Sequence, residues 1–152
     1  MTQRIDFREL NGKLLSGLIQ TGLFLKQSSL DDKLTELVKM RVSQLNGCAF
    51  CLDMHYKDAL QAGELDTRLY SLPAWKECPY YSDAERAALA FAEALTNACR
   101  QDVDDDLFGN LSAQFTATEI AELTLTIALT NSWNRINKTF RTTPGHYVPG
   151  QY

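Results

Sequence analysis

The last long segment of the chain, residues 116–141, most constrains what this sequence can fold into. It opens with Thr116-Ala117-Thr118-Glu119, the Ser/Thr-x-x-Glu pattern of a capping box, which marks a helix start. Residues 123–130 then alternate between apolar residues and mainly threonine with a period of two, which alone would predict a β-strand. The box fixes a helix start and no other segment offers a partner strand, so we predict a helix to Phe140 or Arg141. The chain is therefore expected to be all-α.

Apolar residues recur at helical spacing through most of the remaining chain, which predicts a helical bundle of about six helices. The tail after Pro144 is irregular, and we expect it to pack on a neighbouring molecule. Asn46-Gly47 ends the second helix, because both residues tolerate the left-handed backbone of a helix end. The other expected elements are helices over 6–26, from Asp31 or Asp32 to Asn46, from Cys48 to Ala62 and from Ser82 to Asn97, a short turn over 65–70, and a helix start in the acidic run 102–106.

Length, composition and charge predict one ordinary globular domain over residues 1–152. The apolar fraction of 45% suits a packed core, and the net charge of −4 disfavours a nucleic-acid or acidic-membrane partner. The first residues, MTQRIDFREL, carry no apolar core behind a basic start, and no run of ~18 apolar residues follows. We therefore expect a cytoplasmic protein with no membrane partner.

Residues 36–55, ELVKMRVSQLNGCAFCLDMH, concentrate the reactive side chains of the chain. Helical steps of about 100° place Cys48, Cys51 and His55 on one face of the third helix. Cys51 and His55 are an i,i+4 pair, so the imidazole can accept the thiol proton. Cys48 begins the helix, where the helix dipole lowers the pKa of a thiol. Two cysteines at this spacing can also close to a disulfide, so the pattern indicates a reactive dithiol.

The cysteine count agrees with that interpretation. Four cysteines are too few to staple a chain of this length, and a reducing compartment keeps most of them as thiols. A Cys-x-x-Cys pair in such a compartment is typically redox-active or metal-binding. Cys78 and Cys99 have no local partner, and we interpret each as a small buried hydrophobe.

Glu36 receives conflicting predictions from the sequence. A tight antiparallel hairpin at Asn46-Gly47 would set it level with residue 57, within about one helical turn of His55. The helical wheel, however, puts Glu36 beside Lys39 and away from the Leu/Val stripe of its helix. Periodicity by itself therefore predicts a solvated glutamate.

The spacing E-x11-C-x-x-C-x3-H, formed by Glu36, Cys48, Cys51 and His55, resembles the core motif of a known family. This family is the alkyl hydroperoxidase D-like branch of the carboxymuconolactone decarboxylase superfamily. The surrounding RVSQLNGCAFCLDMHYKDALQAGE resembles it closely, and YSDAERAALAFAEALT and ALTNSWNRINKTFR resemble its later helices.

The resemblance implies a helical bundle that assembles as a homo-oligomer, a trimer or a hexamer. It implies a thiol-dependent peroxidase, or a related disulfide oxidoreductase, that reduces small hydroperoxides and is re-reduced by a protein or lipoyl-type dithiol. Glu36 and His55 would form a proton relay, Cys51 would be the peroxidatic thiolate, and Cys48 would be the resolving, more accessible cysteine. Neither a cofactor nor a metal is implied. Phe50 stands where the well-studied peroxidase has a second histidine between the cysteines, so the relay is one histidine short.

Two other interpretations fit the same residues. Two cysteines, His55 and Glu36 are sufficient zinc ligands in number and type, although structural zinc sites usually gather ligands from separated segments. A non-catalytic oligomer with a redox-sensing dithiol also fits. The sequence determines neither the physiological peroxide nor the reductant.

Overall fold

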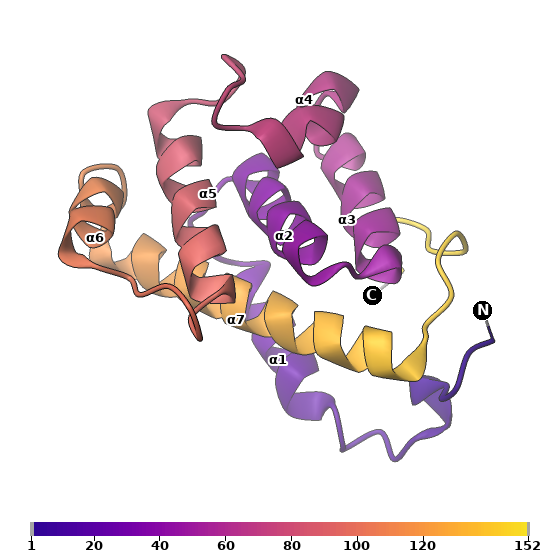
Figure 1. Ribbon diagram of the computed structural model, residues 1–152. Coiled ribbons are helices and arrows are strands. Elements are labelled where there is room, and N and C mark those ends of the chain that lie inside the picture. The colour runs from indigo at the N-terminus through magenta and orange to yellow at the C-terminus, as the bar shows by residue number, and fades with distance from the viewer. Residues whose placement is uncertain (1, 152) are drawn as a thin grey trace.

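The computed structural model describes residues 2–151, and its elements are helical throughout (Figure 1). No strand occurs within these residues, so the prediction of an all-α fold is confirmed. The described elements are η1 (Phe7–Glu9), α1 (Ser16–Leu25), α2 (Asp32–Asn46), α3 (Ala49–Gln61), α4 (Asp66–Ser71), η2 (Leu72–Ala74), α5 (Asp83–Thr96), α6 (Asp105–Ser112) and α7 (Ala117–Phe140).

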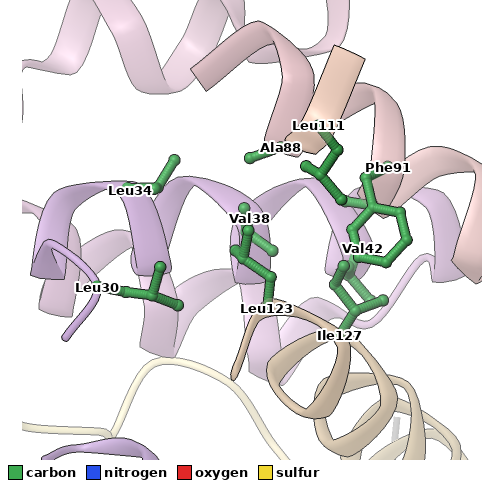
Figure 2. Packing of buried hydrophobic residues seen from close by; sticks show 10 residues of the cluster. Leu30, Leu34, Val38, Val42, Ala88, Phe91, Leu111, Leu123 and Ile127 are labelled. Atoms are coloured by element: carbon green, nitrogen blue, oxygen red, sulfur yellow. The ribbon is translucent and has the colours of Figure 1, made fainter. Parts of the chain in front are cut away.

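Helix α2 is the centre of the bundle. Figure 1 shows it between α3 and α5, with α7 crossing the bundle beside it. One face of α2 packs against α5, α6 and α7 through a cluster of buried apolar side chains (Figure 2). Val38 and Val42 lie at the middle of this cluster and are fully buried. Its members are Leu30, Leu34, Val38, Val42, Ala88, Phe91, Ala92, Leu111, Leu123 and Ile127.

A second face of α2 is buried as well. Leu37 and Met40 pack against α3, α4, η2 and α5 in a separate apolar cluster that includes Trp75 and Tyr81. Because both faces are covered, α2 is a rigid support for the dithiol, which directly follows its C-terminus.

Local signals at the helix ends explain where the elements begin and stop. The Asp31 carboxylate accepts hydrogen bonds from the amides of Lys33 and Leu34, at 2.9 and 3.2 Å, and so caps α2. The capping boxes predicted at the starts of α5 and α7 are both formed. Gly47 ends α2 in the left-handed conformation, with φ of 63°, as the Asn-Gly pair predicted.

The first helix is shorter than the sequence predicts. Residues 7–9 form a 3₁₀ turn, and the α-helix starts only at Ser16. The Asn11 side chain accepts a hydrogen bond from the amide of Lys13 at 3.0 Å, and Gly12 follows it. This local turn competes with a helix, and glycine disfavours one, so the prediction of a helix over 6–26 is wrong in its first half.

The C-terminal tail lies on α3 of the same chain. The amide of Gly145 donates to the Asp53 carboxylate at 3.0 Å, and Lys57 Nζ donates to the carbonyls of Gly145 and Tyr147. Across residues 2–151, no helix has the length and apolar character that crossing a membrane requires.

Candidate functional site

The dithiol is positioned by the turn between α2 and α3. Cys48 follows Gly47 and is the N-cap of α3, where its sulfur accepts from the amide of Cys51 at 3.4 Å. Cys48 and Cys51 form a disulfide, with their Cα atoms 5.3 Å apart. The dithiol therefore starts a core helix directly after an Asn-Gly turn, as predicted.

Helix α7 fixes this turn from the other side. The side-chain amide of Asn46 donates to the side-chain oxygens of Asn131 and Asn134, at 2.8 and 2.9 Å. Lys138 Nζ donates to the Asn46 carbonyl at 2.5 Å, and the fully buried Asn134 donates to the Ser43 hydroxyl at 3.1 Å. Polar groups that are buried and paired in this way hold a single geometry, so the turn cannot move independently of α7.

Both sulfurs are buried in this structure. Cys48 and Cys51 are each 1% exposed, so the expectation that Cys48 is the more accessible cysteine is not met here. They pack with Phe50 and Met54 in a small cluster. Of the other cysteines, Cys78 is partly buried, as interpreted, but Cys99 is exposed.

Glu36 meets His55 across the α2–α3 hairpin. Glu36 Oε2 lies 2.9 Å from His55 Nδ1, and Glu36 Oε1 accepts from Lys39 Nζ at 2.8 Å. The hairpin estimate was therefore right and the prediction of a solvated glutamate was wrong. Because α2 is covered on more than one face, the Leu/Val stripe does not mark its only buried side.

Electrostatics keeps the Glu36 carboxylate ionised. Burial raises its pKa, but the charges and hydrogen bonds of His55 and Lys39 outweigh burial and lower this pKa from 4.5 to about 2. The His55 nitrogen that faces Glu36 is Nδ1, so Nε2 is the nitrogen left for a thiol or a substrate. An imidazole fixed in this way by a carboxylate is suited to accept and return a proton.

A cavity of about 260 Å³ opens beside this pair. Its lining includes the polar residues Glu36, Lys39, His55 and Asp58, and its walls come mainly from apolar residues of α1, α3 and α7. The apolar and aromatic wall residues are Phe7, Leu18, Ile19, Leu23, Leu25, Phe50, Met54, Leu129, Trp133 and Tyr147. The site thus combines an apolar chamber with a few convergent polar groups, as small-molecule sites do.

Asn137 connects this cavity to the dithiol, and no motif in the sequence predicts a role for it. It lines the cavity, and its side-chain amide lies 3.6 Å from Cys51 Sγ, toward which it donates. Asn137 is only 7% exposed, on α7. The sequence holds one indication of such a role: Asn137 is a polar residue on the buried face of α7. Phe50, in contrast, brings an apolar ring to the cavity wall where the resemblance would place a second histidine.

Asp58 and Tyr147 are two further residues of the site that no sequence motif predicted. Asp58 lies three residues after His55, so the helical wheel places both on one face of α3. Tyr147 belongs to the irregular tail, and its hydroxyl donates to Asp58 Oδ1 at 2.8 Å. The tail has no helical periodicity, so the sequence alone does not predict that Tyr147 belongs to the site.

A metal could be held by Glu36, His55 and Asp58, whose ligand atoms all lie within 4.8 Å of one another. These oxygens already accept hydrogen bonds from Lys39 and Tyr147, and an ammonium beside Glu36 opposes a second cation. Within residues 2–151, no such group includes Cys48 or Cys51. The zinc set of two cysteines, His55 and Glu36 is therefore not assembled in this oxidised form.

Comparison with known proteins agrees with this geometry. Residues 13–94 match the carboxymuconolactone decarboxylase family. The chain is similar to protein YdfG of Bacillus subtilis, with 40% identity over 137 residues that cover 90% of this chain and 93% of YdfG. It is also similar to YnjA of Escherichia coli, with 39% identity over 113 residues, 74% of this chain and 61% of YnjA.

Among solved structures, the chain is similar to protein ATU0492 of Agrobacterium tumefaciens, described as a candidate antioxidant defence protein AhpD. The TM-score is 0.92 and the identity 32%, with 96% of this chain and 100% of that chain covered. The family and the Cys48–Cys51 pair together indicate a redox-related function. The chain belongs to the carboxymuconolactone decarboxylase family and is an AhpD-like member of it.

Proposed function

We propose that this protein is a thiol peroxidase that reduces organic hydroperoxides through Cys51 and Cys48. The observation that carries the proposal is the juxtaposition of a bonded Cys-x-x-Cys pair with the Glu36–His55 pair, which lines a mainly apolar cavity. The dithiol supplies two electrons, and the relay supplies a proton. These are the two requirements for cleaving an O–O bond reductively.

Three features support Cys51 as the attacking thiolate. Cys51 lies one turn before His55 on α3, so the imidazole is available to accept its proton. The side-chain amide of Asn137 donates toward its sulfur, and a thiolate accepts such a hydrogen bond more strongly than a disulfide does. The first turn of α3 adds the positive end of the helix dipole.

In the proposed reaction, the Cys51 thiolate attacks the terminal peroxide oxygen. The S–O bond forms as the O–O bond breaks, and the leaving alkoxide takes the proton that His55 accepted from the Cys51 thiol. The products are an alcohol and a sulfenic acid on Cys51. The Cys48 thiol then attacks the sulfenic sulfur, water leaves, and the disulfide seen here is formed.

An external dithiol must then reduce the disulfide by thiol–disulfide exchange. Because both sulfurs are 1% exposed, this step requires the first turn of α3 to open. Phe50 and Met54, which pack on the disulfide and also line the cavity, are the side chains that would have to move. The reductant is therefore expected to limit turnover more than the peroxide does.

The test is peroxide consumption with a small dithiol as electron donor. The starting protein carries Cys78→Ser and Cys99→Ser, because these two free cysteines would otherwise add to any thiol count. We expect Cys51→Ser to abolish turnover, and we expect pre-reduced Cys48→Ser, assayed after the dithiol has been removed, to stop after one peroxide per chain. His55→Ala should reduce the rate by a factor of about 10²–10⁴, the usual contribution of a general base.

A thiol titration before and after peroxide completes the test. The proposal expects one peroxide to remove both thiols of the Cys48–Cys51 pair. If the starting protein, Cys48→Ser, Cys51→Ser and His55→Ala all consumed peroxide alike, the mechanism would be refuted. Retention of both thiols at modest peroxide excess would instead support a dithiol that does not act on peroxides.

A further inference from the structure

A second carboxylate lies beside the relay. Asp58 is on α3 one turn beyond His55, and one of its oxygens lies within 4.8 Å of ligand atoms of both Glu36 and His55. All three side chains line the same cavity. Lys39 pairs with Glu36 at 2.8 Å, whereas the hydrogen bond to Asp58 comes from a neutral hydroxyl, that of Tyr147 at 2.8 Å.

The Tyr147 hydroxyl is delivered by the C-terminal tail. Tyr147 is 7% exposed, and the backbone around it is hydrogen-bonded to side chains of α3. Lys57 Nζ donates to the carbonyls of Gly145 and Tyr147, at 3.3 and 3.1 Å, and the Gly145 amide donates to Asp53 at 3.0 Å. These contacts hold the tail over Asp58. The Tyr147 side chain forms part of the cavity wall.

Charged and titratable groups face Asp58 from each neighbouring element: Glu36 and Lys39 from α2, His55 from α3, and Tyr147 from the tail. Burial raises the pKa of Asp58 above its ordinary value, the charge of Glu36 adds to this rise, and the hydrogen bond from Tyr147 opposes it. Burial, and the hydrogen bond to Asp58, raise the pKa of Tyr147 as well. Tyr147 therefore stays protonated and remains a donor, which favours the ionised form of Asp58.

We propose that Asp58 is a positioning residue of the dithiol site, fixed by Tyr147, and that it stabilises the imidazolium that His55 becomes on accepting the Cys51 proton. The inference deepens the proposed function and rests on it. Two carboxylates then flank one imidazole, and the tail is part of the active site rather than a passive cover. When Asp58 is neutral, the charged His55–Cys51 pair loses one of its counter-charges and the thiolate fraction falls.

The test measures how fast Cys51 is alkylated by monobromobimane between pH 5 and 9. The background protein carries Cys48→Ser, Cys78→Ser and Cys99→Ser, so Cys51 is the sole thiol. We expect Asp58→Asn to raise the apparent pKa of Cys51 by about one pH unit. Tyr147→Phe keeps the ring but lets Asp58 protonate at a higher pH, so it should raise the same pKa by a smaller amount.

The control is a second tyrosine–aspartate pair, formed by Tyr56 of α3 and Asp66 at the start of α4. Tyr56 donates to Asp66 and does not line the cavity, so Tyr56→Phe removes the same kind of hydrogen bond elsewhere and should leave the alkylation profile unchanged. Far-UV circular dichroism checks that each variant is folded. Should Asp58→Asn fail to fold, Tyr147→Phe decides alone.

Superimposable alkylation profiles for the background protein, Asp58→Asn and Tyr147→Phe would overturn the inference. Because alkylation needs no peroxide, the two proposals can fail separately. A shifted profile without peroxide turnover would refute the peroxidase alone. Turnover with unshifted profiles would refute the role of Asp58 alone.

Discussion

At the scale of single residues, the hydrogen bond between Glu36 and His55 serves two purposes. It fixes the imidazole at the site, and it joins α2 to α3 through a pair of side chains that are about nine-tenths buried. Removing one partner leaves the other buried without its counterpart, which is costly. Substitutions at this pair will therefore change stability as well as chemistry.

Glu36 makes stability depend on acid pH. Its folded-state pKa, about 2, lies below its ordinary 4.5, so its stabilisation is complete above about pH 4.5 and is lost as the pH falls toward 2. The effect is on the order of 3 kcal/mol. We expect urea titrations between pH 6 and pH 2.5 to show a shallower loss of unfolding free energy in Glu36→Gln than in the wild type.

A matched control is Glu77→Gln, which changes an exposed glutamate away from the site. This variant should follow the wild-type pH dependence. If Glu36→Gln and Glu77→Gln gave the same dependence, the depressed pKa of Glu36 would not be what stabilises the hairpin.

Single residues also show where sequence analysis was insufficient. Cys48, Cys51 and His55 share one helix, so their common face followed from helical geometry alone. Glu36 lies on a different helix, and its burial depends on how α3 covers α2, which the periodicity of α2 does not reveal. Asn137 and Tyr147 come from still more distant segments, so only the tertiary structure brings them to the site.

At the scale of elements, the turn between α2 and α3 decides where the sulfurs lie. Gly47 occupies the left-handed region there, with φ of 63°, and a Cβ at this position would meet only Lys138 Nζ at 3.8 Å. A side chain at position 47 would therefore fit in the available space. Its cost would come from the left-handed backbone conformation, which residues other than glycine adopt unfavourably. Asn46 is anchored to α7, so the turn cannot relax easily toward another geometry.

We expect Gly47→Ala to lower the free energy of unfolding by about 1 kcal/mol and to slow peroxide turnover, because the strain falls on the residue before Cys48. Gly17→Ala is the matched control. Gly17 lies inside α1 with open space around it, so alanine there should stabilise by about 0.5–1 kcal/mol. Equal effects of the two substitutions on denaturant unfolding would contradict this account of the turn.

The elements were predictable to different degrees for physical reasons. Helices with a capping box or a clear stop, such as α2, α5 and α7, begin and end close to where the sequence indicates. The segment before Ser16 was misassigned because its apolar residues keep helical spacing while the Asn11 side chain closes a local turn. Side-chain competition of this kind is invisible to periodicity.

At the scale of the whole molecule, α1 leaves a large apolar surface uncovered. Leu14, just before it, is 67% exposed, and within it Ile19, Leu23 and Phe24 are 47%, 46% and 62% exposed. Ile19 and Leu23 also line the cavity, so a partner that covers α1 would lie beside the cavity. A large exposed apolar patch is typical of an interaction surface, and the family resemblance implies a homo-oligomer.

We expect the protein to form a homo-oligomer through α1. Phe24→Asp should shift the molecular mass measured by light scattering toward that of the monomer, because it places a charge in the apolar surface. Tyr70→Asp is the control, since Tyr70 is 72% exposed on α4, on the far side of the molecule from α1 (Figure 1). A monomeric wild type, or equal effects of both substitutions, would contradict an interface at α1.

Cys48 has one further consequence, which follows from its position as both N-cap and disulfide partner. Its sulfur accepts a hydrogen bond from the amide of Cys51, and its disulfide ties the N-cap of α3 to the third residue of the helix. Reduction removes this covalent restraint and should therefore speed fraying of the first turn of α3. By thermodynamic linkage, anything that frays this turn favours the reduced form. Reduction of the disulfide and fraying of the helix are then one coupled equilibrium. Hydrogen exchange of the backbone amides in the first turn of α3 would measure it.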